Sequence, residues 1–84
     1  MSEQSEREAI GAAVIETLRK ERKRQNLSMI QLAEKAGLSQ PMISLVERGM
    51  RKPTLDTLLR IAKVLEVNLG RVIEKAISKV TKSR

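Results

Sequence analysis

The sequence contains no cysteine, no histidine and no aromatic residue. Without cysteine no disulfide can stabilise the fold, so its stability must come from helix packing or from a partner chain. The joint absence of histidine and cysteine removes the commonest transition-metal ligands and the usual nucleophile and base pairings. We therefore expect no enzymatic activity, no metal and no other cofactor. The lack of aromatic rings also removes the stacking platforms typical of proteins that bind single-stranded nucleic acid.

Positive charge is what the sequence has in excess. It holds 17 Lys and Arg residues against 10 Asp and Glu residues, a formal charge of +7, and its pI is about 10.4. This balance favours a polyanionic partner, and double-stranded DNA fits best because aromatic residues are missing. Charged residues interrupt the apolar runs, and the polar opening is unlike a signal peptide. We expect a cytoplasmic protein, nucleoid-associated when bound to DNA, with no membrane partner and no small-molecule ligand.

Helical periodicity follows a polar opening. Residues 1–8 lack apolar periodicity and predict a flexible N-terminus, either disordered or the frayed start of a helix. The length of the chain supports a single domain over residues 9–84. The first helix should begin near Glu6, and its apolar residues recur at every fourth position: Ile10, Val14 and Leu18. Because no segment alternates as a strand does, the fold class is all-α.

Local signals then predict a short second helix. Asn26 tolerates the left-handed backbone found at helix ends and should terminate the first helix. Ser28 is followed three residues later by Gln31, a capping-box pattern. The second helix should run from about Met29 to Ala36.

A third short helix follows a glycine-containing turn. Gly37 can adopt the positive φ of such a turn, and Ser39 should cap a helix that tolerates Pro41 in its first turn. This helix should end near Arg48. Two short helices around a glycine turn are the plan of a helix-turn-helix, which we place at residues 28–49.

Two longer helices complete the chain. Thr54 should cap a fourth helix ending near Glu66, and Asn68 should cap a fifth helix over residues 68–81. The fourth helix carries an apolar stripe of Leu55, Leu58, Leu59, Ala62 and Leu65. The stripe of the fifth helix can dock on its own domain or on a second copy of the chain, and we expect both. Its outer part would be exposed to water without a partner, so we predict that this helix forms a homodimer interface. That predicted interface consists of Leu69, Val72, Ile73, Ala76, Ile77 and Val80.

Residues 18–69 resemble the helix-turn-helix domain of the Cro and phage-repressor family, also called the xenobiotic-response-element family. The residues that carry the resemblance are Leu18, Arg22, Leu27, Ser28, Leu32, Ala33, Gly37, Leu38, Ser39, Ile43, Ser44, Glu47, Gly49, Pro53, Thr54, Leu58 and Leu65. The resemblance implies a compact five-helix bundle whose third helix enters the major groove. It also implies dimers that read pseudo-palindromic operators, and an ion pair between Arg22 and Glu47.

The third helix carries the predicted base contacts. Gln40 is the best candidate, because its amide can pair with N6 and N7 of adenine. Ser44 offers a hydroxyl, whereas the apolar side chains beside it would contact thymine methyl groups or fill space. The full predicted set is Gln40, Pro41, Met42, Ser44 and Leu45. Considered alone, Gln40 and Ser44 would be interpreted as ordinary polar residues on a helix surface. Their place in the motif favours a role in DNA binding.

Backbone N–H groups at helix starts and nearby cations predict the phosphate contacts. The predicted residues are Ser28, Met29, Ser39, Arg48, Arg51 and Lys52. Met29 departs from the family pattern, which commonly has a Gln there that touches phosphate and braces the recognition helix. The phosphate contact predicted at Met29 therefore comes from the backbone N–H groups at the start of its helix.

The sequence therefore predicts a homodimeric transcriptional regulator that binds an operator in double-stranded DNA. Phage repressors, controller proteins of restriction-modification systems and antitoxins that repress their own operons all fit this description. A second hypothesis is a protein-interaction module that binds a toxin or another regulatory protein. A third is an architectural protein that coats DNA without sequence preference. Operator sequence and sign of regulation are not predicted.

Overall fold

The computed structural model describes residues 3–82, and these form five helices with no strand, as predicted. The bundle measures 38 × 22 × 20 Å along its principal axes. The helices are α1 (Glu3–Arg24), α2 (Met29–Ala36), α3 (Gln40–Glu47), α4 (Leu55–Leu65) and α5 (Leu69–Lys82).

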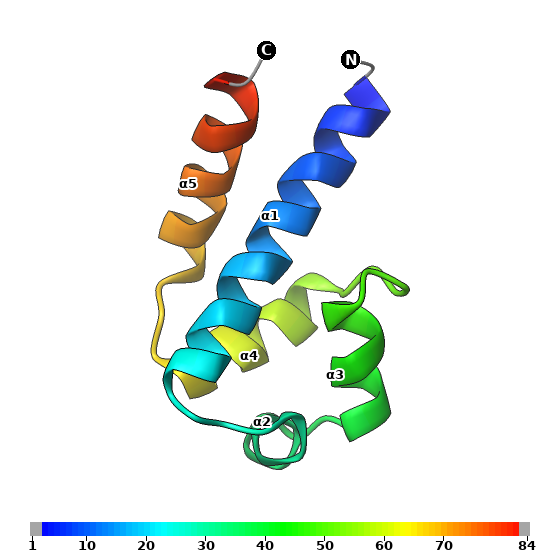
Figure 1. Cartoon of the computed structure of the whole chain (residues 1–84), viewed down its shortest axis with the longest axis vertical. Coiled ribbons are helices and arrows are strands. Elements are labelled where there is room, and N and C mark those ends of the chain that lie inside the picture. Colours follow the sequence, from blue (N-terminus) through cyan, green and yellow to red (C-terminus); the bar gives the residue numbers. More distant parts are fainter. Residues whose placement is uncertain (1–2, 83–84) are drawn as a thin grey trace.

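The helices divide the bundle into two ends (Figure 1). The first half of α1 and the second half of α5 lie side by side and point to the same end of the molecule. We call this pair, residues 3–14 and 73–82, the arm. At the opposite end α2 and α3 pack on each other, α2 also packs on α4, and α3 also packs on α1. We call that part, residues 15–65, the helix-turn-helix end.

The core lies where α1 meets the other four helices. Leu32, Ile43, Val46 and Leu65 have almost no exposed side-chain surface. Around them, each helix contributes apolar residues to one continuous cluster: Val14, Leu18, Leu32, Ala33, Ile43, Ile61, Ala62, Leu65, Leu69, Val72 and Ala76. A single cluster of this kind fixes the position of α3 relative to α1 and α4.

The helix starts are capped as the sequence predicts. The Ser28 hydroxyl accepts a hydrogen bond from the Gln31 N–H at 3.0 Å, and Gln31 Oε1 accepts one from the Ser28 N–H at 2.8 Å. At the starts of α3, α4 and α5, the side chains of Ser39, Thr54 and Asn68 each accept one hydrogen bond from the backbone N–H three residues later. Asn26 has a φ of 57°, in agreement with its predicted role at the end of α1. These caps satisfy backbone groups that would otherwise lack partners.

The N-terminal segment differs from the prediction. Helix α1 begins at Glu3, three residues before the predicted start near Glu6. Met1 and Ser2, which belong to the predicted flexible N-terminus, lie outside the described residues. Two acidic residues in the first turn, Glu3 and Glu6, interact favourably with the positive end of the helix dipole. Residues 3–8 lack apolar periodicity because they form a mostly exposed part of α1.

The apolar stripe predicted for α4 is wider than the buried face of that helix. Leu55 and Leu59 are 63% and 51% exposed, whereas Thr57 and Ile61 are buried. The buried hydroxyl of Thr57 is satisfied because it accepts a hydrogen bond from Thr54 Oγ1 at 3.1 Å. Leu55 and Leu59 lie one turn apart, so they form an exposed apolar side of α4.

Candidate nucleic-acid interface

The turn between α2 and α3 is fixed by backbone geometry. Gly37 has a φ of +70°, in the left-handed region that side chains disfavour. Its N–H donates to Glu34 O, and the N–H of Leu38 donates to Ala33 O at 2.9 Å, the two bonds of a Schellman motif. Ala33, which is buried, lets the two helices approach closely. The turn thus sets the angle at which α3 leaves α2.

Helix α3 is anchored by one side and open on the other. Ile43 and Val46 are 1% and 2% exposed and face the core. On the open side Gln40 and Pro41 are exposed, and the other predicted base-contact residues, Met42, Ser44 and Leu45, are half-buried. The chain does not cover this side of α3, so all five residues keep accessible surface.

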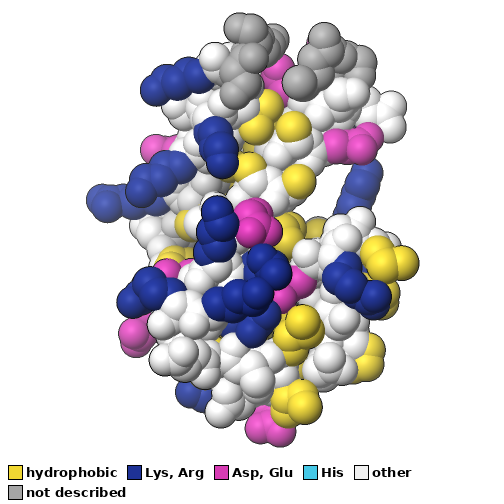
Figure 2. Space-filling model, in the orientation of Figure 1, with side chains coloured by type: hydrophobic (Ala, Val, Ile, Leu, Met, Phe, Trp, Pro, Cys, Tyr) yellow, Lys and Arg dark blue, Asp and Glu magenta, His cyan; other side chains and the backbone are white. Residues whose placement is uncertain are grey.

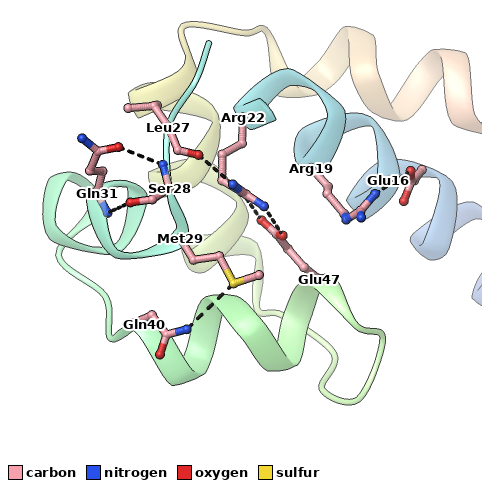
Figure 3. Close-up of polar contacts among 9 residues, drawn as sticks. All are labelled: Glu16, Arg19, Arg22, Leu27, Ser28, Met29, Gln31, Gln40 and Glu47. Carbon is pink, nitrogen blue, oxygen red and sulfur yellow. Dashed lines mark hydrogen bonds and ion pairs between the residues drawn. The ribbon is translucent and has the colours of Figure 1, made fainter. Parts of the chain in front are cut away.

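One hydrogen bond joins the start of α2 to the start of α3. Gln40 Nε2 lies 3.9 Å from the sulfur of Met29 and donates a hydrogen bond to it (Figure 3). Met29 is half-buried and packs against the core cluster, whereas Gln40 is exposed. The amide of the best candidate for base readout is therefore held by a neighbour on the other helix.

The predicted phosphate contacts fall into two groups. Ser28, Met29 and Ser39 lie at helix starts, where backbone N–H groups without helical partners can bind anions. The hydroxyls of both serines are engaged in capping, and Met29 has no side-chain N–H or O–H group. The cations Arg48, Arg51 and Lys52 are exposed at the end of α3 and in the loop after it. Among the six predicted phosphate contacts, these three are the ones whose side chains carry a positive charge.

Arg22 and Glu47 form a buried ion pair behind α3. Arg22 Nε and Nη2 donate to the two carboxylate oxygens of Glu47 at 2.7 and 2.8 Å, and Nη1 donates to the Leu27 carbonyl (Figure 3). Both side chains are less than a tenth exposed, at 7% and 8%. Hydrogen bonding to Glu47 raises the pKa of Arg22 above its usual value. The pair links the end of α1 to the last turn of α3 and thereby fixes the orientation of α3.

Sequence analysis missed a second tether on the same motif. Arg60 Nη1 donates to the Ala36 carbonyl at the end of α2, at 3.4 Å, and Arg60 Nε donates to Asp56 at 2.8 Å. The i, i+4 spacing of Asp56 and Arg60 was a visible signal for the local pair. No local signal indicates that Arg60 also reaches α2.

The predicted dimer interface needs correction. Leu69, Val72 and Ala76 are buried in the core of their own chain and cannot face a partner. Ile77 is 42% exposed, and Ile73 and Val80 are half-buried. The periodicity identified the apolar side of α5, but α1 covers about half of that side.

The surface charge is spread widely. Figure 2 shows Lys and Arg side chains over much of the displayed face, with hydrophobic side chains exposed among them. Among residues 3–82, no group of His, Cys, Asp and Glu has the arrangement needed to hold a metal ion. Over the same residues, no helix is both long and apolar enough to span a bilayer.

The fold and this site define a helix-turn-helix protein. Residues 18–72, more than half of the chain, match the helix-turn-helix family. The chain therefore belongs to the Cro and phage-repressor family of helix-turn-helix transcriptional regulators, as its sequence predicted. Members of this family are DNA-binding proteins rather than enzymes.

Known relatives agree in fold and class. An HTH-type transcriptional regulator of Mycobacterium tuberculosis is 51% identical over 51 residues, which cover 61% of this chain and 36% of that protein. The control protein C.SmaI of Serratia marcescens is 40% identical over 60 residues, with 71% of each chain covered. The crystal structure of the clp gene regulator ClgR from Corynebacterium glutamicum superposes with a TM-score of 0.71 at 27% identity, over 93% of this chain and 79% of that one. The chain spans about a third of the length of the mycobacterial relative.

Proposed function

We propose that this protein is a transcriptional regulator that binds a pseudo-palindromic operator in double-stranded DNA as a homodimer. In this function, α3 enters the major groove and reads bases chiefly through Gln40. The exposed cations Arg51 and Lys52 bind phosphates beside it. Bound at a promoter, the dimer would block or recruit polymerase.

The observation that carries the proposal is the open side of α3. Gln40 and Pro41 stand free of the bundle, while Ile43 and Val46 anchor the opposite side of the same helix. The bidentate Arg22–Glu47 pair holds this helix from behind. An exposed, rigidly held helix with an amide at its start can present hydrogen-bonding groups to base edges.

Selection of bound sequences from a random duplex library tests sequence specificity. We expect a symmetric site whose half-sites lie about one helical turn apart, about 34–36 Å. Gln40→Ala should weaken the preference for adenine at one position in each half-site by about 1–3 kcal/mol. Equal affinity for all duplexes would contradict the proposal and favour the architectural protein.

The salt dependence of binding tests the phosphate contacts. Replacing both Arg51 and Lys52 by Ala should weaken binding to all duplexes and reduce the slope of log K against log salt by about 2. The matched control is replacement of Arg71 and Lys75, two exposed cations on α5, by Ala. An unchanged slope in the first variant would instead favour the protein-interaction module.

We place the dimer contact on the arm. Ile77, with Ile73 and Val80, forms the apolar surface of α5 that α1 leaves uncovered. Burial of this surface would remove apolar area from water.

Sedimentation velocity with two matched variants tests the dimer contact. Ile77→Glu should convert the dimer to a monomer that binds the operator more weakly. Leu59→Glu makes a comparable change on the exposed side of α4, where Leu59 is 51% exposed, and should leave the dimer intact. Dissociation by Leu59→Glu alone would move the interface to α4.

A further inference from the structure

The side-chain amide of Gln40 has one group in a hydrogen bond and two groups that remain available. Its Nε2 donates to the Met29 sulfur, and no other hydrogen bond of this side chain occurs within residues 3–82. A Gln amide carries two N–H donors and one carbonyl acceptor. The contact therefore occupies one donor and leaves Oε1 and the second N–H available.

The position of the Met29 sulfur is restricted by its surroundings. Met29 is the first residue of α2, behind the Ser28 capping box, and its side chain packs against the core cluster. Figure 3 shows the Met29 and Gln40 side chains approaching each other from neighbouring helices. The exposed Gln40 side chain thus donates to a sulfur atom whose position is restricted. The capping box restricts the Met29 backbone, and packing against the core cluster restricts its side chain.

The two free groups of Gln40 match an adenine edge. Pairing with adenine requires a carbonyl oxygen that accepts from N6 and an N–H that donates to N7. When the other N–H donates to sulfur, the amide favours, before DNA binds, the orientation that presents Oε1 to N6 and the remaining N–H to N7. A thioether can fix the orientation in this way, although it is a weak acceptor.

We infer that Met29 is a positioning residue for specificity: its thioether orients the Gln40 amide so that its acceptor and remaining donor face adenine. This inference rests on the proposed function, since it assumes that Gln40 reads a base. It also gives a role to Met29, which stands where the family commonly has a Gln. The Met29 sulfur accepts a hydrogen bond from Gln40, the side chain that reads the base. Met29 makes no contact with the base itself.

Two substitutions separate positioning from packing. Met29→Leu keeps the apolar volume but removes the acceptor, and volume-conserving swaps of this kind are tolerated in cores. Met29→Gln loses apolar character but restores an acceptor. The measurement is the ratio of affinities for duplexes with adenine or another base at the Gln40-dependent position, with circular dichroism melting as the folding control.

If Met29 positions Gln40, the Leu variant should lower adenine discrimination about two- to tenfold, the range expected for one hydrogen bond. The Gln variant should recover it, and should also tighten binding to all duplexes by reaching a phosphate. In a Gln40→Ala background, Met29→Leu should leave the base preference unchanged. Discrimination retained by Leu and lost by Gln would show that Met29 acts through packing alone, and would overturn the inference.

The same measurements keep the two proposals distinguishable. If the wild-type protein shows no base preference, or Gln40→Ala leaves it unaltered, the assignment of Gln40 as reader fails. If Gln40→Ala abolishes an adenine preference that Met29→Leu leaves intact, only the role of Met29 is overturned.

Discussion

The helix-turn-helix end and the arm of this bundle are held by different kinds of contact. At the helix-turn-helix end, directional hydrogen bonds supplement the apolar core: Arg22 binds Glu47 and Leu27, and Arg60 binds Ala36. In the arm and at its base, small apolar side chains such as Val14, Val72 and Ala76 pack between α1 and α5. Towards the tip, Ile77 is 42% exposed.

This difference follows from what each end has to do. A helix that presents donors and acceptors to base edges must keep a fixed angle, and hydrogen bonds depend on angle whereas apolar burial does not. In the proposed dimer, the arm has only to stay together and to leave apolar surface for a second copy. We therefore expect substitutions at the helix-turn-helix end to be costly and substitutions in the arm to be tolerated.

The largest effect should follow from Glu47→Ala. Removing this carboxylate leaves the Arg22 guanidinium buried with only the Leu27 carbonyl as a partner. Breaking a buried pair in this way costs about 3–5 kcal/mol because the remaining charge is uncompensated. Urea denaturation followed by circular dichroism measures the change in the free energy of unfolding.

Glu16→Ala is the matched control for this prediction. Glu16 pairs with Arg19 at 3.3 Å, and the side chains of Arg19 and Glu16 are 36% and 46% exposed. Exposed pairs contribute less than about 1 kcal/mol. Equal losses in the two variants would mean that the buried pair has no special place in the stability of the helix-turn-helix end.

The elements that the sequence predicts well are those fixed by local chemistry. The Ser28 capping box, the left-handed Gly37 and the cap at Asn68 depend on residues within one turn of each other. Their signals can be read from spacing alone, since the same short segment contains both partners. The boundaries of α2 to α5 and the helix-turn-helix followed directly from these signals.

The sequence does not correctly predict which side of α4 and of α5 is buried, because segments distant in sequence cover these helices. Leu55 and Leu59 belong to a continuous apolar stripe, yet the packing of α4 buries Thr57 and Ile61 instead. Likewise, Val72 lies on the predicted dimer surface but is covered by α1. Periodicity gives the direction of an apolar side, whereas its partner depends on contacts between segments far apart in sequence.

Gly37→Ala tests the turn of the helix-turn-helix end. A side chain at a φ of +70° is strained, and the left-handed conformation costs about 1–2 kcal/mol for residues other than glycine. The added Cβ would also lie 3.1 Å from Arg60 Nη1, the tip of a side chain that can shift. The free energy of unfolding should fall by about that amount, and an unchanged value would show that the turn relaxes without strain.

Gly11→Ala makes the same chemical change in the arm and should have the opposite sign. Gly11 lies inside α1 at an ordinary helical φ, and nothing lies within 4 Å of an added Cβ. Alanine is favoured over glycine in a helix interior by about 0.5–1 kcal/mol. The midpoint of urea denaturation should rise, and a fall would indicate that the arm needs the flexibility of glycine at this position.

The smallest effect concerns the contact between the end of α1 and the end of α4, within the helix-turn-helix end, and it depends on pH. Hydrogen bonds from Arg24 and Gln25 lower the pKa of Glu21 from 4.5 to about 2, and Gln25 also donates to the Leu65 carbonyl at the end of α4. Because this pKa is lower in the folded state, the ionised carboxylate contributes stability above pH 4.5, and that contribution is lost as the pH falls towards 2.

Glu21→Gln removes this titration and isolates its effect. The difference in free energy of unfolding between wild type and variant should be constant above pH 4.5 and should shrink as the pH falls from there to about 2. Arg24→Ala should reduce the same pH dependence, because Arg24 makes the larger contribution to the lowered pKa. Parallel pH profiles for wild type and Glu21→Gln would show that this carboxylate does not couple protonation to folding. The contact between α1 and α4 would then depend on the Gln25 bond to Leu65 instead.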